Sequence, residues 1–124
     1  MHDQPSVAEL VQAVKNFIDK TAGPNLTGHA AFHARVASNA LATVLRDIDQ
    51  RPNAEAAERA RLIALLDASE EMSLGDLNAD LSNRIRQGEM TPSTTGLLAH
   101  LKATTMAQVE IDQPRYSGLK TAKD

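Results

Sequence analysis

Apolar residues recur at helical spacing along almost the whole chain, and this periodicity limits the fold more than any other feature. The clearest case directly follows Ser6, and its apolar members are Val7, Leu10, Val11, Val14, Phe17 and Ile18. Their spacing of three and four residues places them on one helix face. Ser6 with Glu9 three residues later is typical of a capping box, which fixes a helix start. Because no alternating β-branched run with hairpin turn residues interrupts the pattern, the sequence predicts an all-α protein.

Proline and cap residues divide the pattern into five expected helices. Breaks are expected at Gly23-Pro24-Asn25 and at Arg51-Pro52-Asn53, since proline cannot extend a preceding helix. Ser73 and Thr91 are suited to cap later helices, with Pro92 at the first helical position. The expected helices cover approximately residues 7–22, 26–50, 54–68, 74–87 and 92–112.

The length of the chain allows one hydrophobic core rather than two. With 124 residues, folding buries roughly two-thirds of the surface that the unfolded chain exposes. We therefore expect a single domain over residues 1–124, built as a bundle of about five antiparallel helices, because the connections are short. The bundle core is expected over about residues 6–112, followed by an extended C-terminal tail at residues 113–124.

Charge and composition argue against several classes of partner. A formal net charge of −3 with mixed signs provides no basic stripe, so we expect no binding to nucleic acid or to a membrane. The chain has no cysteine, which excludes disulfides and thiolate chemistry. No apolar run reaches the ~18 residues that span a bilayer, and residues 1–5 carry no basic-then-apolar export pattern. The expected location is the cytoplasm.

The second expected helix carries polar candidates for a site. His29 and His33 lie four residues apart, the spacing at which two imidazoles can share a zinc ion. No third ligand follows at a matching spacing, so no metal site is predicted. Arg35 and Asn39 also lie one turn apart, in an otherwise small and apolar stretch. Asn39 either forms a buried hydrogen bond that fixes helix register or joins Arg35 in a ligand site.

Two further segments supply candidates for recognition. Arg59 either pairs with Glu55 one turn earlier or binds a phosphate or carboxylate. Arg115 and Tyr116 follow Pro114 in a rigid polar segment, which either docks on the chain's own helices or anchors a partner. Because the sequence has no glycine-rich phosphate loop, Gly-x-Ser-x-Gly elbow or plausible Ser-His-Asp set, an independent enzyme is disfavoured and no cofactor is predicted.

Several short motifs together resemble a known family. They are FHARVASNAL at residues 32–41, ERARL at 58–62, LLAHL at 97–101 and PRYSG at 114–118. Over residues 5–119 the chain resembles a family of small bacterial all-helical domains of unknown function, encoded beside aminoglycoside-phosphotransferase-like kinases and acyl-CoA dehydrogenases. The resemblance implies an accessory subunit of such a system, with no assigned activity. Its motif positions include His33, Arg35, Asn39, Arg59, His100, Arg115 and Tyr116.

Two functions remain open from the sequence. The first is a non-catalytic helical accessory or interaction module that forms a homodimer, or that pairs with a phosphotransferase-like kinase or an acyl-CoA dehydrogenase. The alternative is a small-molecule binding domain for an acyl-CoA or a phosphorylated acid. In that alternative Arg35, Asn39, Arg59 and His100 converge between helices.

Overall fold

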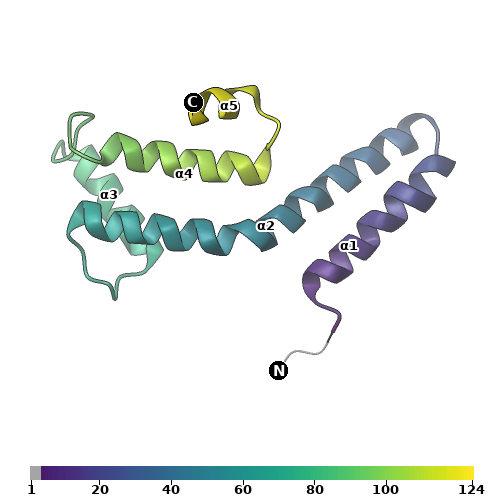
Figure 1. Cartoon of the computed structure of the whole chain (residues 1–124), viewed down its shortest axis with the longest axis horizontal. Helices are drawn as coiled ribbons and strands as arrows, with labels where there is room; N and C mark the ends of the chain where they lie inside the picture. Colours follow the sequence, from purple (N-terminus) through teal and green to yellow (C-terminus); the bar gives the residue numbers. More distant parts are fainter. Residues whose placement is uncertain (1–3) are drawn as a thin grey trace. The chain divides into compact units, whose positions relative to one another are not determined.

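The fold is all-α, as the periodicity predicts. A computed structural model describes residues 4–124, and in this part of the chain it contains five α-helices and no strand. The export-signal prediction draws partly on residues 1–3, which lie outside the described residues. The helices, shown in Figure 1, are α1 (Val7–Phe17), α2 (Gly28–Leu66), α3 (Leu74–Arg86), α4 (Leu97–Asp112) and α5 (Ser117–Lys123).

The chain forms two compact units, Met1–Gln50 and Arg51–Asp124, which we call unit 1 and unit 2. Helix α2 contributes its first part to unit 1 and its second part to unit 2. The single domain expected from the chain length stays a prediction. Across residues 4–124, no helix combines the length and the apolar character needed to cross a membrane.

Unit 1 is a helical hairpin. Helix α1 lies beside the first part of α2 and runs in the opposite direction (Figure 1). The predicted capping box is confirmed, since the Glu9 N–H donates to Ser6 Oγ at 3.2 Å and the Ser6 N–H donates to Glu9 Oε2 at 2.7 Å. After α1 the chain continues as a π-helix, η1 (Ile18–Ala22), and a 3₁₀ turn, η2 (Gly23–Asn25). The predicted Gly23-Pro24-Asn25 segment therefore ends the helical path.

The predicted break at Arg51-Pro52-Asn53 is wrong, because α2 continues through Pro52. The expected helices over residues 26–50 and 54–68 are thus parts of one helix. Proline lacks the N–H that would bond the carbonyl four residues earlier, and its ring crowds that carbonyl, but its own φ is helical. Alanine, arginine and glutamate are frequent on the C-terminal side, and their high helix propensity favours continuation.

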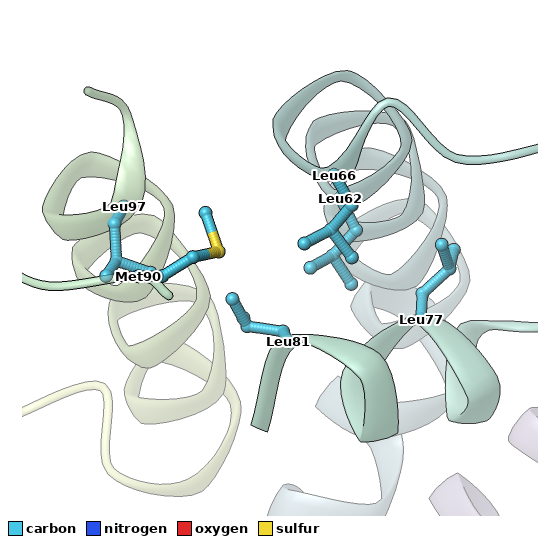
Figure 2. Packing of buried hydrophobic residues seen from close by; sticks show 6 residues of the cluster. All are labelled: Leu62, Leu66, Leu77, Leu81, Met90 and Leu97. Carbon is cyan, nitrogen blue, oxygen red and sulfur yellow. The ribbon is translucent and has the colours of Figure 1, made fainter. Parts of the chain in front are cut away.

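Unit 2 contains the hydrophobic core. Helix α4 lies beside the second part of α2 and runs in the opposite direction (Figure 1). Leucines from α2 and α3 meet there with side chains from the α3–α4 connection and from the start of α4 (Figure 2). Ser73 caps α3 as predicted, accepting from the Asp76 N–H at 3.1 Å. The core cluster consists of Leu62, Leu66, Leu77, Leu81, Met90 and Leu97.

The expected start of the last long helix at Thr91-Pro92 is wrong. The Thr91 N–H donates to Thr94 Oγ1 at 2.9 Å, and residues 91–96 form turns. Helix α4 begins only at Leu97, after Gly96 in the left-handed region with φ of 87°. A threonine side chain that bonds nearby backbone competes with helix formation, which explains the later start.

The C-terminal tail is more ordered than expected. Residues 117–123 form α5, so an extended tail over residues 113–124 is not confirmed. Leu119 is buried, and Lys123 Nζ lies 2.5 Å from Glu110 Oε1 on α4. These contacts hold α5 against α4.

Candidate functional site

Unit 1 exposes an apolar stripe along α1. Spacings of three, four and three residues place its members on one helix face. Between 52% and 67% of the surface of each of these residues is exposed. Ser38 alone among residues 4–50 is buried, so in this part of the chain the large apolar side chains form no closed core. This α1 stripe consists of Val7, Leu10, Val14 and Phe17.

The first part of α2 carries a second exposed stripe. Its members are separated by four or eight residues, so they follow one i, i+4 ridge, which winds by about 40° around the helix every four residues. Phe32 and Val36 therefore lie on a different side of α2 from Val44 and Ile48. Their exposed fractions lie between 38% and 53%. Patches of this kind on soluble proteins commonly mark interaction surfaces. This α2 stripe consists of Phe32, Val36, Val44 and Ile48.

A polar contact joins the two arms of the hairpin. Ser38 Oγ on α2 donates to Asp19 Oδ1 in η1 at 2.5 Å. Asp19 also pairs with Lys15, whose Nζ lies 2.6 Å from Asp19 Oδ2. The hydrogen bonds from Lys15 and then Ser38 hold the pKa of the Asp19 carboxyl below its usual value. This contact sets the register of α2 against the segment that follows α1.

The three candidates on α2 in unit 1 are all exposed. His33 packs edge-on against Phe32, with ring centroids 5.5 Å apart. Arg35 borders a surface cavity of about 250 Å³ beside Asp19 and Pro24. The side chain of Asn39 is exposed, so the buried register-fixing hydrogen bond expected there belongs to its neighbour Ser38.

Arg59 in unit 2 holds a loop. Its guanidinium donates to the backbone carbonyl oxygen of Met72 from Nε at 3.3 Å and from Nη2 at 3.2 Å. It also donates to the carbonyl of Glu70. These bonds fix the connection between α2 and α3, so the predicted pairing of Arg59 with Glu55 is not its principal interaction.

His100 is buried on α4 and lies among charged groups. Burial, and then the nearby positive charge of Arg61, lower the pKa of His100, while Glu58 raises it. The imidazole is therefore predominantly neutral at neutral pH. Within residues 4–124, His100 Nδ1 and Arg61 Nε are buried without a hydrogen-bond partner.

Polar side chains around His100 connect three helices. Asn78 Nδ2 on α3 donates to Glu58 Oε1 on α2 at 2.8 Å. Arg61 Nη2 on α2 donates to Thr104 Oγ1 on α4 at 3.2 Å. These four residues also line a cavity of about 120 Å³. Glu58 and Thr104 were not sequence candidates, because spacing along one helix does not reveal partners on another.

The C-terminal candidates lie between α4 and α5, and both are exposed. The Tyr116 ring lies over Gly118, where an added Cβ would come within 2.6 Å of Cε1. Arg115 has no hydrogen-bond or ion-pair partner within the described residues. Tyr116 thus packs on its own segment while 56% of its surface stays exposed.

The residues of the small-molecule hypothesis are divided between the two units. Arg35 and Asn39 belong to unit 1, whereas Arg59 and His100 belong to unit 2. In unit 2, Arg59 is bonded to the α2–α3 loop and His100 lies beside Arg61. Across the described chain, no three His, Asp or Glu side chains gather closely enough to hold a metal ion.

The profile of a domain of unknown function, DUF6285, matches residues 24–116, which are 93 of the 124 residues. The chain belongs to this family. The DUF6285 region contains the α2 stripe and the polar residues around His100, while the α1 stripe precedes it. Neither the comparison with curated proteins nor the comparison with solved structures finds a match.

Proposed function

We propose that this DUF6285 protein is a non-catalytic helical interaction module that binds a protein through the α1 stripe and the α2 stripe. The observation that carries the proposal is the exposure of the eight large apolar side chains of these two stripes in unit 1, where Ser38 alone of residues 4–50 is buried. Covering a half-exposed side chain of this size contributes about 1 kcal/mol. Eight such side chains provide a substantial driving force for association.

The chemistry of the stripes favours a helical partner. Ridges of side chains at i, i+3 and i+4 spacing pack into the grooves of another helix. The partner candidates are a second copy of the chain, and the phosphotransferase-like kinase and acyl-CoA dehydrogenase that the family resemblance names. As an accessory subunit the protein adds surface to an assembly and needs no catalytic group of its own.

Binding to purified candidates tests this proposal. Since the chain has no cysteine, a fluorophore attached through Leu98→Cys on α4 labels one site outside both stripes. We expect the anisotropy to rise on titration with at least one candidate, namely unlabelled chain, kinase or dehydrogenase. Val14→Glu in the α1 stripe is expected to weaken that binding by about tenfold or more, which is ~1.4 kcal/mol.

A matched control separates a specific surface from general hydrophobicity. Leu101 on α4 is also a large exposed apolar residue, and it lies outside the stripes. Leu101→Glu is expected to retain the affinity that Val14→Glu loses. The proposal is wrong if no candidate binds at about 100 µM or below, or if both variants bind equally well.

The cavity in unit 2 is the observation that favours the small-molecule alternative. Its volume of about 120 Å³ is well below the ~300–1,000 Å³ of typical ligand sites, so it favours a small phosphorylated acid over an acyl-CoA. Arg61 would supply the positive charge. A rise in melting temperature with small phosphorylated acids that Arg61→Met abolishes would favour this alternative over the interaction module.

A further inference from the structure

We infer that the occupant of the α1 stripe is a second copy of this chain, paired so that two α1 helices lie antiparallel across a two-fold axis. This inference rests on the proposed function, because it names the partner of the same surface. Three features support it: the spacing of the stripe, the charges beside it and the apolar area that it offers.

The spacing of the α1 stripe is the same when it is followed from either end. Antiparallel pairing centred at the level of residue 12 places Val7 opposite Phe17 of the second copy, and Leu10 opposite Val14 of the second copy. Each large side chain therefore meets another large side chain. A two-fold interface requires this self-complementarity, because the same patch serves both copies. The three-and-four spacing is also that of the apolar seam between paired helices.

The charges on α1 do not oppose this pairing. On the open flank of the stripe the neighbouring positions are Ser6 and Ala13, which are uncharged. Glu9 and Lys15 are each one residue away from a stripe position, so they lie on other faces of the helix. Lys15 is also already paired with Asp19. Association therefore removes no unpaired charge from water and places no like charges face to face.

The apolar area agrees with what a stable dimer needs. A standard interface buries ~800 Å² on each partner, of which roughly 60%, or about 500 Å², is apolar. From the fractions exposed, the α1 stripe offers roughly 400 Å² of accessible surface. The Ser38–Asp19 contact sets the register of the two antiparallel arms. Ile48 follows Ser38 by ten residues and is therefore level with Glu9, which precedes Asp19 by ten residues. Ile48 and Val44 raise the total to roughly 500 Å².

Sedimentation equilibrium and cysteine cross-linking test the inference. We expect the 124-residue chain to have twice the 13.3 kDa mass of the monomer at micromolar concentration. Leu10→Glu is expected to be monomeric with its helix content retained, whereas Leu98→Glu on α4 stays dimeric. Mild oxidation is expected to link two copies of the Ala13→Cys variant, because Ala13 lies closest to the axis. Val7→Cys is not expected to link to itself, since its counterpart lies at the other end of the pair.

The outcomes distinguish this inference from the proposed function. A wild-type chain that remains monomeric at about 100 µM overturns the dimer. If that monomer still binds the kinase or the dehydrogenase in a manner sensitive to Val14→Glu, the proposed function stands without it. If it binds neither, both are wrong. Equal cross-linking of Ala13→Cys and Val7→Cys overturns the antiparallel orientation, because parallel helices would place both residues beside their own copies.

Discussion

Truncation of Leu62 is expected to be among the most destabilising changes in this chain. Leu62 lies on α2 with 0% of its surface exposed, against Leu77 and Leu81 of α3 in the core of unit 2 (Figure 2). Leu62→Ala removes three carbon atoms, a loss of ~2.4 kcal/mol at ~0.8 kcal/mol for each buried carbon. The cavity adds to this loss, so the expected decrease in the free energy of unfolding is about 3 kcal/mol, within the ~2–5 kcal/mol range of such truncations.

Urea unfolding followed by far-UV circular dichroism measures this decrease. The total stability of a domain of this size is ~5–15 kcal/mol, so a loss of about 3 kcal/mol moves the midpoint clearly. Leu98→Ala is the matched control, because Leu98 is 58% exposed and should change stability by less than ~0.5 kcal/mol. A loss below ~1 kcal/mol for Leu62→Ala, or equal losses for both variants, would refute the assigned core.

Three further expectations follow from individual contacts. Removing the cap with Ser6→Ala is expected to cost ~1 kcal/mol of helix stability, seen as lower helix content in a peptide of α1. Burial lowers the pKa of His100 in the folded state below the ordinary 6.5, so the unfolded chain binds more protons and the free energy of unfolding falls as the pH decreases below 6.5. In His100→Gln the midpoint of urea unfolding should depend less on pH in this range. The same pH dependence in both proteins would contradict the burial of His100. Gly118→Ala is expected to displace the Tyr116 ring and increase acrylamide quenching of the single tyrosine, whereas unaltered quenching would contradict their contact.

The helix starts were predictable where the signal is local. The capping side chains of Ser6 and Ser73 bond backbone groups three residues away, so a short sequence window contains the whole interaction. The predicted break at Pro52 is wrong because the helix formed by many residues on both sides outweighs the unfavourable effect of one proline. Thr91 failed as a cap because its segment forms turns that depend on Thr94 and on the left-handed Gly96.

The candidate sites were less predictable than the helices. Periodicity places Val7 and Phe17 on one helix face, but the same pattern describes a face covered by the chain itself and a face open to a partner. Likewise Asn39 and Ser38 are adjacent in sequence, and only the position of Asp19 on the neighbouring arm determines which of them is buried. The partner of Arg59 lies eleven to thirteen residues away, in a loop, where helical spacing gives no information.

Thiol labelling tests most directly whether the α1 stripe is a binding surface. Val14 and Leu98 are 53% and 58% exposed, so Val14→Cys and Leu98→Cys would be labelled at similar rates if both positions stay uncovered. We expect labelling of Val14→Cys to slow as the concentration of the chain rises or as the kinase or dehydrogenase is added, while Leu98→Cys keeps its rate. Equal rates for the two variants under all of these conditions would show that the α1 stripe is not a binding surface.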